Sequence, residues 1–277
     1  LPEIKASALI YGDDNKAYWS DFTTSNTEGW SKVAEGGSYY AGALYNDELL
    51  VYSGDTMFGV DPDTFETTSY GTIASSWIWS DAAAAPAVDG AFGDLAALCM
   101  NGTYLEMINP AEGTLTYYDM SSAFADDPMA TIAYAGSGTY DYVYLWYDYP
   151  NCPANFYYVM TESGELYKFT LFYIAEQDNY SALREDLGNT GLELPNVSAV
   201  TAGQYASMIF DQDSGYLVLS SYQYGDTATV YVINPETLLP AVAGTFGDKV
   251  WPAVSLYQYQ RATDLTLKVN PTSASIY

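Results

Sequence analysis

The sequence predicts an all-β fold of repeated four-stranded antiparallel units, and three observations support this prediction. A phrase recurs along the chain: a run of β-branched and aromatic residues, a turn on Asp-Pro, Asn-Pro or Gly, and a second β-rich run. Most copies are 40, 48 or 52 residues apart, which is the period of a propeller blade. Only residues 174–188 have helical character. A β-propeller of four-stranded antiparallel blades accounts for all three observations.

Each copy of the phrase predicts a β-hairpin. β-Branched and aromatic residues suit a pleated strand, proline fixes φ for the turn, and the preceding Asp or Asn hydrogen-bonds the turn backbone. The clearest copies are residues 51–65, 104–113 and 230–238, and looser copies are residues 17–24 and 156–168.

The spacing of the turns favours five blades. The turn anchors are Asp21, Asp61, Asn109, Thr161 and Asn234, and the last interval, of 73 residues, is too long for one blade. The excess holds residues 174–188, which end on a glycine as a short helix would, and we interpret this stretch as an excursion from one blade. Six blades are the alternative if the long interval hides a degenerate one.

Further strand candidates fill the units to four strands each. They are residues 39–45, 132–135, 142–147, 208–210 and 217–222. Residues 251–260 read as one more strand with no hairpin behind it, while the N-terminal unit lacks its first strand. Pairing of the two terminal strands would close the propeller and remove its exposed sheet edges. The predicted propeller domain is residues 1–262.

Composition excludes several classes of function. Thirty-five acidic and eight basic residues give a net charge of -27, which repels nucleic acid and anionic lipid, so neither nucleic-acid binding nor direct membrane insertion is expected. The absence of histidine excludes Ser-His-Asp and Cys-His catalysis and imidazole-bound zinc. No cofactor is expected, and calcium is only a weak candidate.

The hairpin turns resemble those of β-propeller repeat proteins of the YVTN and quinoprotein-like type, whose blades carry a strand, an Asp-Pro-x-Thr-Gly turn and a second strand. Asp61-Pro-Asp-Thr, Asn109-Pro-Ala-Glu-Gly and Asn234-Pro-Glu-Thr carry the resemblance, whereas Thr161-Glu-Ser-Gly lacks the proline. The resemblance spans roughly residues 9–260, and it implies a propeller fold without implying a particular activity.

The C-terminal tail carries a second resemblance. Residues 265–277, with an apolar alternation followed by Pro-Thr-Ser-Ala, resemble the opening strand of a bacterial immunoglobulin-like domain of the invasin and intimin type. Residues 263–277 are therefore expected to be a linker and the first strand of a truncated domain. The resemblance implies a longer modular bacterial protein, secreted or on the cell surface, with neighbouring domains; Leu1 is likewise no natural translation start.

Clustered aromatic residues are the candidate ligand-binding groups, because Tyr and Trp present flat amphipathic faces to sugars and proteins. The candidates are Trp146, Tyr147, Tyr149, Tyr222, Tyr224, Trp77 and Trp79. Strand alternation predicts one face with Tyr142, Tyr144 and Trp146 and another that includes Tyr147. Packing between blades is the commoner role of such aromatics, so those at strand ends, next to loops, are favoured for exposure.

The sharpest acidic motif is residues 211–215, where Asp211 and Asp213 precede Gly215. These carboxylates could bind calcium, but a turn is favoured because the bidentate glutamate of an EF-hand is missing near Gln223. Cys99 lies in an apolar run, and Cys152 lies between two prolines that indicate a turn. A disulfide between the two is the less favoured alternative to free cysteines.

Three functions remain open. The favoured one is a non-catalytic extracellular module that binds a glycan or a protein with loop aromatics at the propeller mouth. The first alternative is a glycoside hydrolase or lyase with paired carboxylates there, for which no catalytic residue is assigned. The second is a structural spacer.

Overall fold

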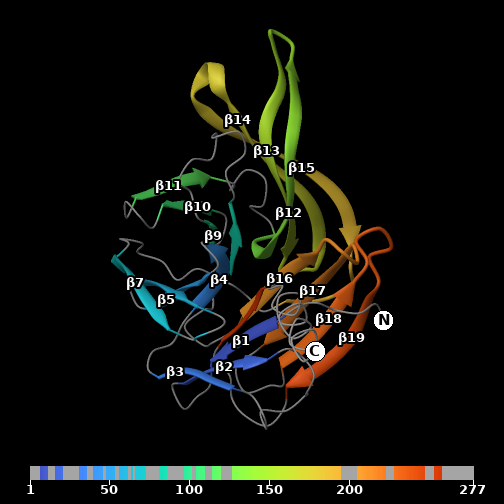
Figure 1. The fold of residues 1–277 in the computed structure, drawn as a ribbon. Coiled ribbons are helices and arrows are strands. Elements are labelled where there is room, and N and C mark those ends of the chain that lie inside the picture. Colours follow the sequence, from blue (N-terminus) through green and yellow to red (C-terminus); the bar gives the residue numbers. More distant parts are fainter. Residues whose placement is uncertain are drawn as a thin grey trace, which may run out of the picture.

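The computed structural model describes residues 7–11, 16–20, 31–35, 40–45, 48–53, 56–61, 64, 66–72, 81–85, 97–101, 104–109, 114–119, 127–194, 205–222, 228–246 and 253–257. Figure 1 shows that these residues form β-sheets, with one short 3-10 helix, η1 (Ala175–Gln177), among the described elements. The predicted immunoglobulin-like strand, residues 263–277, lies outside the described residues.

The described strands form five antiparallel sheets of four strands each. The first sheet contains β20 (Ala253–Tyr257), β1 (Ser7–Tyr11), β2 (Lys16–Ser20) and β3 (Ser31–Glu35). The second contains β4 (Tyr40–Tyr45), β5 (Glu48–Ser53), β6 (Thr56–Val60) and β7 (Thr67–Thr72). The third contains β8 (Asp81–Ala84), β9 (Ala97–Asn101), β10 (Tyr104–Asn109), β11 (Thr114–Asp119). The fourth contains β12 (Met129–Tyr144), β13 (Tyr147–Thr161), β14 (Glu165–Ile174) and β15 (Asn179–Asn189). The fifth contains β16 (Tyr205–Asp211), β17 (Tyr216–Tyr222), β18 (Ala228–Ile233) and β19 (Pro240–Phe246).

One edge strand of each sheet lies next to edge strands of two other sheets. β4 contacts β8 and β20, β12 contacts β8 and β16, and β16 contacts β20. The terminal strands β1 and β20 pair antiparallel from Ser7–Tyr257 to Tyr11–Ala253, as the sequence predicts.

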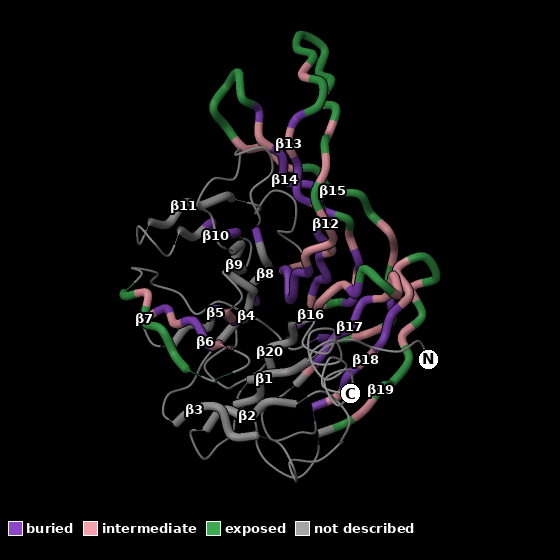
Figure 2. The backbone as a smooth tube through the Cα atoms, in the orientation of Figure 1, coloured by how far each residue is buried: buried purple, intermediate pink, exposed green. Residues whose placement is uncertain are grey.

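Buried apolar residues form the contacts between neighbouring sheets. One cluster joins Ala83 and Leu105 to Ile132 and Phe169, and a second joins Leu166 to Leu217 and its neighbours. At the start of β12, residues 129–133 are all buried, so this part of the strand is covered on both faces. The outer strands β7 and β15 are mostly exposed or half-buried. Figure 2 shows this gradient, from buried strands to the exposed β7 and β15.

A buried carboxylate adds a polar contact between two sheets. Asp81, at the start of β8, is 1% exposed and accepts hydrogen bonds from the Thr131 hydroxyl and, at 3.1 Å, from the Ile132 amide of β12. A buried carboxylate is tolerated where hydrogen-bond donors satisfy it, and these hydrogen bonds make Asp81 a link between the two sheets.

Several predicted turns have the expected chemistry. The Asp61 carboxylate accepts the Thr64 amide at 2.9 Å, and the Asn234 side chain accepts the Glu236 amide at 2.8 Å. In the Asp211 motif the carboxylate accepts the Asp213 amide and the Ser214 hydroxyl. The turn interpretation of that motif is therefore confirmed.

The helical prediction for residues 174–188 is wrong. β14 continues to Ile174, η1 supplies a three-residue turn, and β15 returns along β14 as the fourth strand of its sheet. Gly188 is no helix end: its φ is 127°, and Leu238 of the next sheet lies where a side chain would stand. Packing between sheets thus overrides the local helical preference.

The interval before Asn234 is long because the turn at Thr161 is not equivalent to the other predicted turns. The Thr161 turn joins the second and third strands of its sheet, whereas the Asp61, Asn109 and Asn234 turns join third and fourth strands. The equivalent turn is residues 175–178. The strands β12 and β13, of 16 and 15 residues, lengthen the interval between Asn109 and this turn, and the strands of residues 127–194 form one four-stranded sheet.

The predicted strand 142–147 and the predicted turn at Cys152 are also wrong. The chain reverses at Leu145 and Trp146, and Cys152 lies inside β13, paired with Tyr140. The prolines mark a β-bulge instead, with Asn151 at φ 60° and its amide bonded to Asp141 at 2.9 Å. Cys152 is buried and free, so it forms no disulfide.

Candidate functional site

The longest hairpin of the described structure projects beyond the sheet that carries it (Figure 1). β14 pairs with β13 only from Ala154 to Met160, so residues 139–153 form a two-stranded ribbon, the projecting hairpin. Two bulges shape it: one beside Gly136, which has φ 125° and lies just before the ribbon begins, and one at Asn151. Bulges bend and twist a strand pair, which directs this hairpin away from the sheet.

The end of the projecting hairpin exposes apolar side chains. We call residues 143–147 the hairpin tip: Val143 is 72% exposed, Leu145 88% and Trp146 82%, and Tyr144 and Tyr147 are also exposed. Figure 2 shows the whole tip as exposed. Side chains as exposed as these contribute little to the core of the protein, and contiguous apolar patches of this kind mark interaction sites on protein surfaces.

Four tyrosines line one face of the projecting hairpin, and we call them the tyrosine ladder: Tyr142, Tyr144, Tyr147 and Tyr149. Tyr142 pairs with Tyr149, Tyr144 pairs with Tyr147, and neighbouring rings stack with centroids 5.8–6.4 Å apart and interplanar angles of 4–10°. Tyr147 therefore shares the face of Tyr142, contrary to the prediction. The reason is the turn at residues 145–146, which removes Trp146 from the strand alternation.

The base of the ladder is packed against the sheet. Phe172 is fully buried and lies 4.8 Å from the Tyr140 ring and 5.4 Å from the Tyr142 ring, measured between centroids. Cys152 and Ile174 complete this small apolar cluster. Burial raises the pKa of the Cys152 thiol, so the thiol is protonated at neutral pH and serves as a packing group.

The neighbouring hairpin supports the ladder from the side. Gln177, in the η1 turn between β14 and β15, donates a hydrogen bond to the Tyr149 hydroxyl at 3.2 Å. In the same turn the Tyr173 hydroxyl donates to Asp178, and this bond raises the pKa of Tyr173. The Gln177 hydrogen bond holds Tyr149, at the base of the ladder, whereas the described tip makes no such contact with a neighbouring strand.

The opposite face of the projecting hairpin is acidic. Asp148 pairs with Val143, Asp141 lies two residues before Val143, and both carboxylates are exposed. Residues 137–153 contain no lysine or arginine, and the adjacent η1 turn adds Glu176. The tip is thus an apolar knob with carboxylates beside it.

The structure places three of the predicted binding residues on the projecting hairpin: Trp146, Tyr147 and Tyr149. They do not lie at a mouth between sheets, where they were expected, because the bulged hairpin carries them away. The side chains of Tyr222, Tyr224, Trp77 and Trp79 lie outside the described residues.

Sequence reasoning missed Val143, Tyr144 and Leu145 as candidate site residues. The available signal was the run Tyr142-Val-Tyr-Leu-Trp-Tyr147 with Asp on each side, whose symmetry about residues 145–146 is that of a hairpin.

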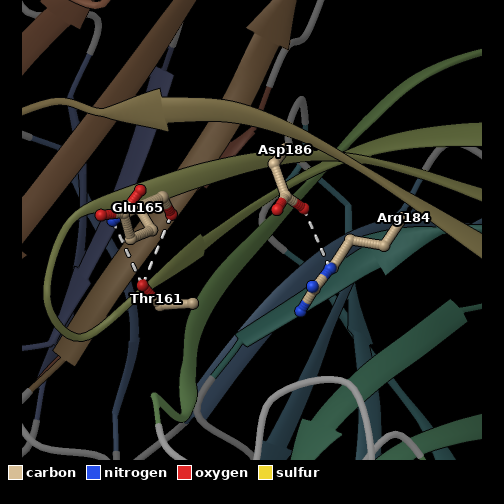
Figure 3. Close-up of polar contacts among 4 residues, drawn as sticks. All are labelled: Thr161, Glu165, Arg184 and Asp186. Atoms are coloured by element: carbon tan, nitrogen blue, oxygen red, sulfur yellow. Dashed lines mark hydrogen bonds and ion pairs between the residues drawn. The ribbon is translucent and has the colours of Figure 1, made fainter.

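Other polar contacts in this sheet are structural (Figure 3). Arg184 and Asp186 form an ion pair on exposed β15, with Arg184 Nε 3.1 Å from the carboxylate, and the Thr161 hydroxyl accepts the Glu165 amide at 3.2 Å. Within the described residues, no group of three or more acidic or cysteine side chains is placed to hold a metal ion. No helix in the same part of the chain is long and apolar enough to cross a membrane.

Comparison with known proteins gives little. No protein-family model matches the chain, and no curated protein matches it. Among solved structures, the chain is similar to apo AztD from Citrobacter koseri with a TM-score of 0.35 and 9% identity. The match covers 92% of this chain and 61% of that one, so this chain spans less than two thirds of the AztD chain. A TM-score this low establishes neither a shared fold nor a shared function.

Proposed function

We propose that the protein is a non-catalytic binding module built on a five-bladed β-propeller. Two observations support the propeller. Each of the five sheets has the four antiparallel strands of a blade, and their edge strands β20, β4, β8, β12 and β16 contact one another in cyclic order. The pairing of β1 with β20 is the closure that a propeller requires.

The projecting hairpin is the binding element of this module. The observation that carries the proposal is the exposure of Val143, Leu145 and Trp146 on a hairpin whose base is fixed by Phe172. Exposed apolar side chains on a rigid support can be buried by a ligand at a low entropic cost. The ligand is a glycan or a protein, and the tyrosine ladder supplies the aromatic faces on which a glycan would stack.

The module belongs to a larger secreted or cell-surface protein of a bacterium, in this proposal. The resemblance of the tail to a bacterial immunoglobulin-like domain supports that setting. A hydrolase at the propeller mouth is the weaker alternative, because the exposed apolar surface that supports binding lies on the hairpin.

A glycan panel with a catalytic readout tests the proposed function. The full chain is applied to the panel with and without calcium, and released reducing ends are measured in the same wells. Binding without release is expected if a glycan is the ligand, and release would overturn a non-catalytic role. The variant Leu145→Ser/Trp146→Ser should lose binding, whereas Leu239→Ser, which changes another exposed leucine, should keep it. Binding that both variants retain would remove the hairpin as the binding element.

A further inference from the structure

We propose that the ligand of the hairpin tip is a protein with a concave apolar pocket and a basic rim. This inference rests on the proposed function and narrows it to one class of partner. It is carried by the shape of the tip, by the kind of side chain it exposes and by the charge beside it.

The shape requires a concave partner. Residues 139–153 form a two-stranded ribbon with a side-chain face on each side and the turn at its end, so the tip has no hollow of its own that could enclose a small ligand. In a complex of this kind, the projecting element enters a pocket and the pocket excludes water from it.

The side chains favour a protein over a glycan. The most exposed residues are Leu145 and Trp146, followed by Val143, and two of these three are aliphatic. Aliphatic side chains gain free energy by transfer into an apolar pocket, whereas a hydroxyl-covered sugar offers them little. The rings at the base of the ladder, Tyr142 and Tyr149, are half-buried against one another and against the sheet.

The charge specifies the rim of the pocket. When Val143 and Leu145 enter a pocket, the exposed carboxylates of Asp141 and Asp148 reach its edge. No lysine or arginine within residues 137–153 neutralises them, and the chain carries a charge of -27. Lysine or arginine at the rim of the partner would speed association and select this orientation.

The same charge disfavours two other occupants. A second copy of the chain would bring another body of charge -27 and another pair of carboxylates to the interface. An anionic bilayer surface would likewise repel Asp141 and Asp148.

The test uses a displayed library of ankyrin-repeat proteins, whose randomised face is concave, selected against the full chain. Binders are measured against wild type, Leu145→Ser/Trp146→Ser, Asp141→Asn/Asp148→Asn, and two controls. Leu239→Ser matches the apolar change, and Glu185→Gln/Glu236→Gln matches the charge change at exposed positions elsewhere. The Asp141→Asn change keeps a side-chain oxygen that can accept the Asn151 amide, so the charge variant leaves the bulge intact.

The expected result is that most binders lose at least about tenfold in affinity on the tip variant, because a buried Trp and Leu are typical hot-spot residues. Their randomised faces should be enriched in Arg or Lys. The charge variant should slow association severalfold at low salt and have no effect at high salt. Neither control should change binding.

Three results would overturn the inference, and they separate it from the proposed function. Binders that need the tip but not Asp141 and Asp148 would remove the basic rim and leave the binding role standing. Glycan binding that needs Tyr144 and Tyr147, or a concentration-dependent dimer broken by Leu145→Ser, would keep the hairpin as binding element with another occupant. Binders whose affinity is unchanged by the tip variant would contradict both the inferred partner and the proposed role of the hairpin in binding.

Discussion

The base and the tip of the β12–β13 hairpin consist of the same two strands, yet they bury their residues in opposite ways. At the base, Ile132, Tyr157 and Val159 are fully buried between neighbouring sheets. At the tip, Val143 and Leu145 are 72% and 88% exposed. Apolar residues at the base stabilise the fold, whereas those at the tip contribute nothing to packing and are available to a partner.

The largest expected difference between the two regions is in the free energy of unfolding. Phe169→Ala removes a fully buried ring of β14 that packs against Tyr157 at the base, and it should cost about 3–5 kcal/mol. Trp146→Ser removes an even larger side chain at the tip and should change stability by about 0.5 kcal/mol or less. Urea denaturation of both variants checks the comparison. A similar loss for both would mean that the tip packs against the molecule.

The second effect concerns the link between the base and the next sheet. Asp81→Ala leaves the Thr131 hydroxyl and the Ile132 amide buried without their acceptor, and it should cost about 2–3 kcal/mol. Asp148→Ala, at the exposed tip, is the control and should be near neutral. Equal denaturation midpoints for the two variants would contradict a stabilising role of the Asp81 contact.

A smaller effect locates the boundary between base and tip. Tyr142 touches both Phe172 and Tyr149, so Tyr142→Ala should cost about 1 kcal/mol. Tyr144→Ala, one step farther along the ladder, should cost less because its ring contacts only the ladder. Thermal unfolding measures the two losses of stability, and their ratio locates the boundary between base and tip. A larger loss for Tyr144→Ala than for Tyr142→Ala would place this boundary closer to the end of the hairpin.

The smallest effect is a pH dependence confined to the base. Complete burial raises the pKa of the Tyr157 hydroxyl far above its ordinary value of about 10. Because the unfolded chain loses this proton first, the stability contributed by Tyr157 is fully present below pH 10 and falls as pH rises above it. At pH 10.5 the loss from this one group is about 0.8 kcal/mol.

Tyr157→Phe isolates this contribution from those of the other tyrosines. The free energy of unfolding of the wild type and of the variant is measured at pH 8 and at pH 10.5. The wild type should lose more stability than the variant over that interval. Tyr147→Phe, at the exposed tip, should follow the wild type. A Tyr157→Phe variant with the full alkaline loss would show that this hydroxyl is accessible in the folded state.

Local chemistry explains which features the sequence predicted. The turns at Asp61, Asp211 and Asn234 depend on a side chain that bonds its own backbone, so they could be recognised within a few residues. The pairing of β1 with β20 followed from counting strands in repeated units. Trp146, Tyr147 and Tyr149 are candidates because they belong to an aromatic cluster, and Tyr147 and Tyr149 also lie at a predicted strand end next to a loop.

The features that sequence reasoning missed depend on contacts between distant residues. Residues 174–188 carry a helical pattern, but pairing with β14 and packing of Leu238 at Gly188 make them a turn and a strand. The prolines around Cys152 indicated a turn, and only the partner strand shows that they belong to a bulge.

The sequence by itself thus determined the all-β class, the repeated hairpins and the net charge of -27, because propensity, turn chemistry and charge follow from the residues themselves. Tertiary structure alone decided which aromatic residues are buried and which are exposed. A period-two pattern has the same form in a strand covered on both faces and in a ribbon that extends beyond its sheet. The pairing of β14 with β13, which ends at Ala154 and leaves residues 139–153 uncovered, separates the two cases and makes the hairpin tip available for binding.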